Sequence, residues 1–167
     1  EMIKRTLKEG VFMICVGTDF EASKKAIKLA GEYDGIWATV GLHPNDNLKE
    51  KFNPEIYENL LNQEKVIGFG EIGLDYYRTE KSEDQKIQKQ RFQEQLELAG
   101  KVGKPLVIHC RNAHQDLFEN LKLKTENFPL RGVIHSFTGT LEEAKKYLEL
   151  GFYLGFNGII TFTSQYD

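Results

Sequence analysis

The chain has 167 residues and a formal net charge of −3, with 40% hydrophobic and 28% charged residues. This composition is that of an ordinary globular domain with one core, and it excludes a disordered or fibrous chain. A slightly acidic chain has no basic stripe that would hold nucleic acid by charge alone, although bound cations could contact phosphate instead. We find no signal-peptide pattern and no apolar run long enough to cross a bilayer, so we expect a cytoplasmic protein without a membrane partner.

The two ends of the sequence are unusual. The first residue is Glu1, and residues 1–8 read as part of an amphipathic helix that is already under way. The last residue, Asp167, follows closely on a predicted strand. We therefore expect both ends to be cuts through a longer protein.

Six short apolar segments are predicted to be strands, and helical patterns separate them. Nearly continuous apolar runs of this kind are typical of parallel strands that are covered on both faces. Cys15 and Cys110 lie inside two of these runs, which favours buried free thiols in a reducing compartment over a disulfide. The predicted strands cover residues 11–17, 36–42, 65–70, 105–110, 132–137 and 152–160.

Capping residues mark where several of the intervening helices begin and end. Thr140 with Glu143 three residues later is a capping box, and Asn53 before Pro54 is a good start signal. Gly103 is placed to end the long helix over residues 83–102. Further start signals are Thr18 or Asp19, Ser82 with Gln85, and Asn112 with Gln115.

The alternation of strand and helix indicates the fold class. Six units with roughly 20 to 40 residues between strand starts are the pattern of right-handed parallel βαβ connections. An open doubly wound sheet would be favoured by a glycine-rich phosphate loop after the first strand, and residues 16–19 do not supply one. Polar residues at the ends of several strands favour an α/β fold of the (β/α)8 TIM-barrel type instead. Because such barrels need about 250 residues, we expect an incomplete barrel of about six units, forming a single domain over residues 1–167.

The polar residues at the predicted strand ends suggest a metal site. Three of the four histidines follow apolar strands, and Glu71 lies in the glycine-rich segment 68–78 after the third strand. A glutamate there is costly to bury unless a cation meets it. Because imidazole and carboxylate together suit Zn, Mn, Fe or, less well, Mg, we expect Glu71, His109 and His135 to converge on a metal.

Strand alternation adds Asp75 and Arg111 to this face, because Asp75 is four residues after Glu71 and Arg111 is two after His109. An arginine near a metal can hold a phosphate with two hydrogen bonds. A simple ion pair between Asp75 and Arg111 that braces the rim is an equally good interpretation. His114 lies in the first turn of a helix, and we expect it to be exposed or to cap that helix.

With these residues identified, the chain resembles the TatD family of metal-dependent deoxyribonucleases, which have amidohydrolase-like barrels. The resemblance covers essentially the whole chain and rests on four ordered motifs. They are Val-Gly-Leu-His-Pro at 40–44, Gly-Glu-Ile-Gly-Leu-Asp-Tyr at 70–76, the segment 105–114, and His-Ser-Phe-Thr-Gly at 135–139.

The resemblance implies site roles and an activity. Glu71 is similar to the family's metal-bridging catalytic glutamate, His109 and His135 match two histidine ligands, and His43 matches a histidine at the substrate end. Strand alternation, rather than the resemblance, makes Asp75 and Arg111 residues that we expect to support the ligands or to bind substrate. The implied reaction is hydrolysis of DNA phosphodiester bonds, in the manner of a 3'-5' exodeoxyribonuclease acting on single strands, with two divalent ions (Mg, Mn or Zn) per complete site and no obligate protein partner.

Two motifs of the family are not present in this sequence. They are an early His-x-His and a late Glu-Thr-Asp whose aspartate is a metal ligand. We therefore expect weak activity from the chain as given. Two other interpretations stay open: a metal-dependent amidohydrolase or phosphotriesterase-like enzyme acting on a small substrate, and an inactive truncated barrel. Such amidohydrolases often have a lysine at the strand end where this chain has Glu71, so Glu71 favours the nuclease.

Overall fold

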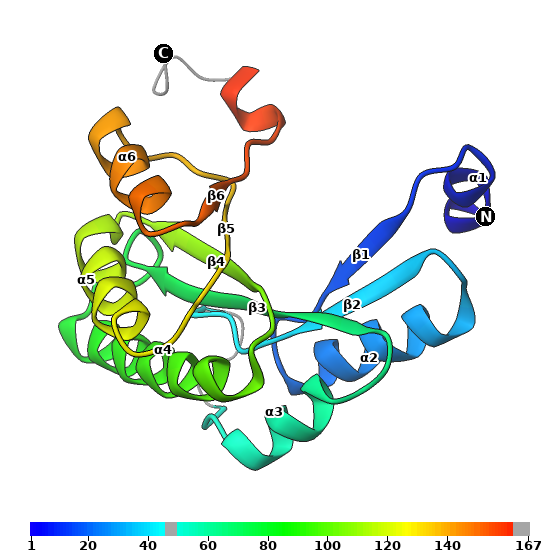
Figure 1. Ribbon diagram of the computed structural model, residues 1–167, viewed down its shortest axis with the longest axis horizontal. Coiled ribbons are helices and arrows are strands. Elements are labelled where there is room, and N and C mark those ends of the chain that lie inside the picture. The colour runs from blue at the N-terminus through cyan, green and yellow to red at the C-terminus, as the bar shows by residue number, and fades with distance from the viewer. Residues whose placement is uncertain (46–49, 162–167) are drawn as a thin grey trace.

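The structure is a computed structural model that describes residues 1–45 and 50–161. Within these residues a parallel sheet of six strands alternates with helices (Figure 1). The strands are β1 (Met13–Val16), β2 (Ile36–Val40), β3 (Val66–Asp75), β4 (Leu106–Arg111), β5 (Gly132–His135) and β6 (Tyr153–Leu154). The helices are α1 (Met2–Lys8), α2 (Phe20–Glu32), α3 (Pro54–Leu61), α4 (Ser82–Val102), α5 (His114–Thr125) and α6 (Leu141–Glu149), followed by a 3₁₀ turn, η1 (Gly158–Thr161).

The order of the strands decides between the two predicted architectures. The strands lie side by side in chain order, β1-β2-β3-β4-β5-β6, and every pair is parallel. A doubly wound sheet would reverse direction at a switch point, whereas a sheet that keeps its order is the wall of a barrel. The helices α2 to α6 follow the outer side of this curved wall, and β1 and β6 lie at its two ends (Figure 1). The prediction of an incomplete α/β barrel is confirmed.

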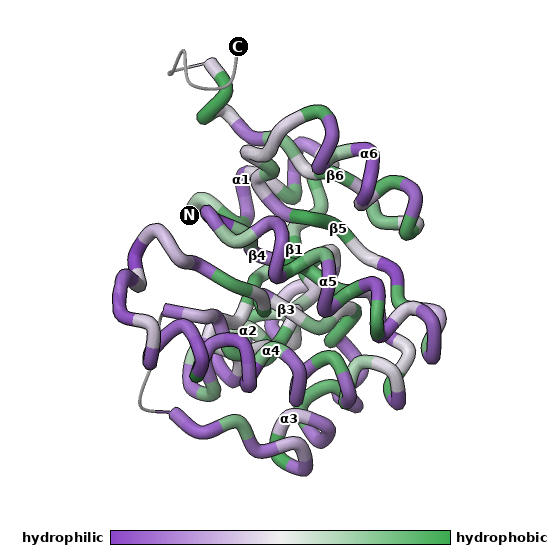
Figure 2. Tube along the Cα trace, turned by 90° about the vertical axis from the view of Figure 1, so that its left-hand side faces the viewer, coloured by the Kyte–Doolittle hydropathy of each residue, from purple (hydrophilic) through white to green (hydrophobic). Residues whose placement is uncertain are grey.

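The core lies between the outer helices and the sheet. Apolar segments follow the strands and the inner sides of the helices, while polar residues lie outside (Figure 2). Met13 and Cys15 pack against this core, whereas the alternate residues Ile14 and Val16 point to the opposite face of the sheet and are exposed. Both cysteines are free, and Cys110 is buried. None of the described helices is both long and apolar enough to cross a membrane.

Several of the predicted helix ends are confirmed. Asp19 accepts from the Ala22 amide, Asn53 caps α3 ahead of Pro54, and Thr140 with Glu143 forms a complete capping box. Gly103 ends α4 in the left-handed region, with φ of 65°.

Two predicted caps and one strand are wrong. Ser82 is the first residue inside α4, and α5 begins after Ala113 without a side-chain cap. The sixth strand covers only Tyr153–Leu154 of the predicted residues 152–160. Farther along, the Asn157 side chain accepts from the Ile159 amide at 2.9 Å at the start of η1, where the chain turns. An asparagine that bonds the backbone two residues on favours a turn over a strand.

A buried glutamine, Gln95, holds the end of β2 to helix α4. Its side-chain oxygen accepts from the Leu42 amide at 2.9 Å, and its side-chain nitrogen donates to the Leu42 carbonyl at 3.1 Å. Both backbone groups of Leu42 are thereby satisfied away from water. Because an unpaired buried polar group costs about 1–3 kcal/mol, this amide contributes to the stability of the fold.

We predict that Gln95→Met, which keeps the length of the side chain, lowers the free energy of unfolding by about 2 kcal/mol in urea titrations, since Leu42 loses both partners. Gln90→Met on the exposed face of the same helix is the matched control and should change stability by less than about 0.5 kcal/mol. Equal stability of the two variants would contradict this role of Gln95.

Candidate metal centre

The carboxyl-terminal ends of β2 to β5 bring the polar residues of the sequence together. His43 follows β2, Glu71 and Asp75 lie within β3, and His109 lies within β4. The register pairs Asp75 with Arg111, and it pairs His109 with Gly73 on one side and His135 on the other. One edge of the sheet therefore presents acids, imidazoles and a guanidinium in the same place.

Two glycines allow β3 to lie closely against β4 at this edge. A side chain at Gly70 would collide with the Val107 carbonyl, and one at Gly73 would overlap the His109 carbonyl. Gly73 also has a φ of 143°, a conformation that other residues rarely adopt. The register of β3 shifts between Gly70 and Ile72, and Glu71 lies at this irregularity, where its amide donates to the Gly17 carbonyl at the end of β1. Bulges commonly redirect a side chain near a functional site.

Glu71, His109 and His43 form a compact group. Each offers one ligand atom, and these atoms lie within 4.8 Å of one another. The Glu71 Oε1 atom is 3.0 Å from His109 Nδ1 and 3.9 Å from His43 Nε2. Among the residues that the structure describes, this is the one group of three or more such side chains that could hold a metal ion.

Asp75 is a second carboxylate on His109. Its Oδ2 atom is 3.0 Å from His109 Nε2, so each ring nitrogen of His109 faces a carboxylate. Burial alone would lower the pKa of His109, but the hydrogen bonds and charges of Asp75 and Glu71 raise it to about 9. The centre therefore favours a positive charge between its two acids.

Both carboxylates stay ionised in this arrangement. Burial would raise the pKa of Glu71, but its hydrogen bond to His109 and the charges of His43, His109 and His135 lower it. Burial likewise opposes ionisation of Asp75, while its bond to His109, the Arg78 amide and the charges of His109 and Arg111 lower its pKa. The ionised Glu71 carboxylate beside the imidazole nitrogens of His43 and His109 is a donor set that fits a divalent cation, and Asp75 holds the His109 ring from its other side.

His43 has a different environment from His109. Its Nδ1 atom accepts a hydrogen bond from the Asn45 amide at 3.2 Å. Since a backbone N–H can only donate, a neutral His43 carries its proton on Nε2, which faces Glu71. In this tautomer the ring offers a proton to the site, which suits contact with a substrate oxygen better than coordination of a metal.

His135 does not join the compact group. It is exposed, and its Nε2 atom lies 3.0 Å from the Ser136 hydroxyl. The next residue, Ser136, has a left-handed φ of 48°, and its hydroxyl also accepts from Asn157 at 2.6 Å. His135 is nevertheless the register neighbour of His109, and its charge contributes to the lowered pKa of Glu71.

Arg111 stacks on an aromatic ring and does not pair with Asp75. Its guanidinium carbon lies 3.7 Å from the centroid of the Tyr77 ring, and no ion pair joins it to Asp75 among the described residues. Arg111 still lowers the pKa of Asp75 by its charge. The prediction that His114 is exposed or caps its helix is wrong. The ring is half-buried because its Nδ1 lies 3.3 Å from the Cys110 thiol and 3.1 Å from the Tyr147 hydroxyl, and it packs edge-on against Phe137.

The sequence did not predict the role of Gln88, which links the segment after β2 to the end of β3. Gln88 is buried in α4; it accepts from the Asp75 amide at 2.9 Å and donates to the Asn45 side chain at 2.9 Å. It also donates to the Thr79 hydroxyl at 2.8 Å. The available signal was its position four residues before Phe92, on the apolar stripe of the helix.

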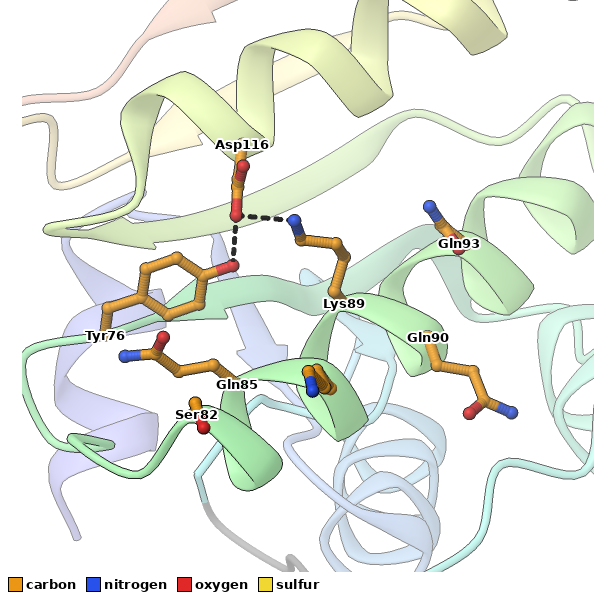
Figure 3. Close-up of a pocket in the computed structure, with 8 residues that line it drawn as sticks. Tyr76, Ser82, Gln85, Lys89, Gln90, Gln93 and Asp116 are labelled. Atoms are coloured by element: carbon orange, nitrogen blue, oxygen red, sulfur yellow. Dashed lines mark hydrogen bonds and ion pairs between the residues drawn. The ribbon is translucent and has the colours of Figure 1, made fainter.

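A second polar network lies behind the strand end. Tyr76 donates to Asp116 at 2.7 Å, and Lys89 pairs with the same carboxylate oxygen at 2.7 Å (Figure 3). They line a groove of about 300 Å³ between α4 and α5. This network ties β3 to α4 and α5, and it is separate from the acids that face His109.

Comparison with known proteins identifies the family. The profile described as TatD related DNase matches residues 1–167. The chain is 40% identical over 157 residues to a deoxyribonuclease Tat-D of Schizosaccharomyces pombe, covering 87% of this chain and 50% of the relative. It is 34% identical over 162 residues to a 3'-5' ssDNA/RNA exonuclease TatD of Klebsiella pneumoniae, covering 95% of this chain and 60% of the relative.

Solved structures agree with this match. A TatD homologue from Escherichia coli superposes with a TM-score of 0.80 at 30% identity, over 90% of this chain and 57% of that chain. A TatD family hydrolase from Entamoeba histolytica gives 0.78 at 30% identity, over 92% and 54%. The chain thus spans about half to three fifths of the length of these relatives. It belongs to the family of TatD-related DNases.

Proposed function

We propose that this chain carries part of the catalytic centre of a metal-dependent nuclease that hydrolyses phosphodiester bonds in single-stranded DNA from the 3' end. The observation that carries the proposal is the placement of two ionised carboxylates on the two nitrogens of His109, at the edge of the sheet where barrel enzymes have their active sites. Relatives named as a deoxyribonuclease and an ssDNA/RNA exonuclease support the substrate class.

The metal ligands in this proposal are Glu71, His109 and His135. In the complete site these residues would hold divalent ions, two of Mg, Mn or Zn. When bound, the ions would lower the pKa of water and neutralise charge on the phosphate. His135 lies beside His109 in the register of the sheet, and it would contribute a ligand once its side chain turned away from Ser136.

The remaining residues orient substrate and move protons. His43 offers its Nε2 proton to a phosphate or leaving oxygen, and the Asn45 amide holds the ring in that tautomer. Asp75 fixes the ring of His109 through Nε2, so that the other ring nitrogen points at Glu71. Arg111 contributes a positive charge for the phosphate at the end of β4. We further propose that residues 1–167 form one domain in the cytoplasm and need no protein partner.

We predict that the protein loaded with Mg or Mn shortens a 5'-labelled single-stranded oligonucleotide from its 3' end. Glu71→Gln should reduce both this activity and the bound metal at least tenfold, because the variant loses an anionic ligand. Elemental analysis of the purified proteins gives the metal content, and gel electrophoresis gives the cleavage. Glu97→Gln is the matched control, since Glu97 is exposed and its carboxylate pairs with Lys124.

Unchanged metal content in Glu71→Gln would remove Glu71 from the ligand set. Hydrolysis of a small phosphotriester or lactone, without any cleavage of the oligonucleotide, would favour the small-substrate hydrolase over the nuclease. Absence of every activity, with the metal still bound, would support an inactive barrel fragment.

His43→Gln is predicted to lower kcat by about 10²- to 10⁴-fold, the usual contribution of a positioned proton donor, while the bound metal stays unchanged. The comparison with Glu71→Gln separates a donor from a ligand. Loss of metal from His43→Gln, measured in the same elemental analysis, would instead place this ring among the ligands.

The centre also predicts a pH dependence of stability in the metal-free protein. The pKa of His109 is raised to about 9, above its unfolded value of about 6.5. Its stabilising contribution is therefore fully present below pH 6.5 and is lost as the pH rises through 9, by up to about 3 kcal/mol. Urea unfolding in EDTA should show this decline, and His109→Gln should remove it.

Added Mn should also remove the decline, because the cation replaces the proton between the two acids. A metal-free protein whose stability is flat between pH 6.5 and 9 would contradict the charge balance that we assign to the centre.

A further inference from the structure

An exposed aromatic side chain, Tyr77, stands at the rim of the candidate metal centre. It lies two residues after Asp75 and is 56% exposed. Its neighbour Tyr76 points toward α5, where its hydroxyl donates to Asp116 (Figure 3). The two tyrosines are therefore in different environments, and only Tyr77 is open to a ligand approaching the centre.

The loop that carries Tyr77 is fixed by the residues of the centre itself. The Asp75 side chain accepts from the Arg78 amide at 2.9 Å, closing a turn around Tyr76 and Tyr77. The Tyr76 amide donates to the Arg111 carbonyl at 2.9 Å, which anchors the same turn to β4. The backbone on both sides of Tyr77 is thus tied to residues of the centre.

One face of the Tyr77 ring is already covered by a cation. The Arg111 guanidinium carbon lies 3.7 Å from the ring centroid, and Arg111 comes two residues after His109. A guanidinium stacked on a ring keeps its N–H groups free at the edge, where they can hold a phosphate. Single-stranded nucleic acids are bound by this combination of aromatic stacking surfaces and cationic groups.

We propose that Tyr77 and Arg111 form a subsite for one unpaired nucleotide, with its base stacked on the open face of Tyr77 and its phosphate held by Arg111 beside the metal centre. The inference rests on the proposed nuclease function and adds a physical reason for a preference for single strands. A base can reach the ring only when it is not stacked and paired within a duplex.

The test compares an oligothymidylate with a strand of equal length that carries abasic residues at its 3' end, using the metal-loaded protein. Tyr77→Leu removes the ring and is expected to raise KM for the oligothymidylate roughly 5- to 100-fold with little effect on KM for the abasic strand. Tyr77→Phe keeps the ring and is expected to restore a low KM. Tyr76→Phe, which removes a hydroxyl bound to Asp116, is the matched control outside the subsite.

An equal rise in KM for both strands would show that Tyr77 only positions Arg111. No rise for either strand would show that Tyr77 neither stacks on a base nor positions Arg111. Both results overturn base stacking, while the nuclease function stands. Failure of the unsubstituted metal-loaded protein to cleave either strand would overturn the nuclease proposal and this subsite together.

Discussion

One imidazole ring, that of His109, is held between two carboxylates, and the rest of the site depends on this arrangement. Glu71 and Asp75 each lie 3.0 Å from a ring nitrogen, and Asp75 is 1% exposed. Two carboxylates on opposite nitrogens of one partly buried ring are stabilised in their ionised form by a positive charge between them. A proton on His109 supplies that charge in the absence of metal. A divalent cation supplies more of it, so the folded chain is arranged in advance for metal binding.

Backbone geometry makes this placement possible. Strand β3 contributes both acids and lies very close to β4. Any side chain at Gly70 or Gly73 would collide with the carbonyls of Val107 or His109, so only glycine fits at these two positions. The irregular register near Glu71 then directs this carboxylate toward His43 and His109. The close approach of β3 to β4 that these glycines allow therefore places Glu71 and Asp75 on either side of the His109 ring.

The sequence predicts the fold well because its signals are local. Alternation of apolar runs and amphipathic helices indicates the barrel wall, and Asn53 and Thr140 cap their helices as their side chains require. The site is predicted less completely, because alternation tells which face a side chain occupies and not which contact it makes. His135 has the expected register beside His109, yet its ring turns to Ser136. Nothing in residue order shows that the backbone at Ser136 takes a left-handed φ.

Helix α4 holds two parts of the site in alignment, the end of β2 before His43 and the end of β3 at Asp75. Gln88 and Gln95 are seven residues apart and so lie on the same side of the helix, two turns from one another. Gln95 bonds both backbone groups of Leu42, the residue before His43, and Gln88 bonds the backbone of Asp75. Buried amides of this kind are costly unless every partner is present, so each allows one geometry of the strand end that it contacts. Apolar side chains at these two positions would leave backbone groups of Leu42 and Asp75 without their partners and would no longer fix the strand ends that carry His43 and Asp75.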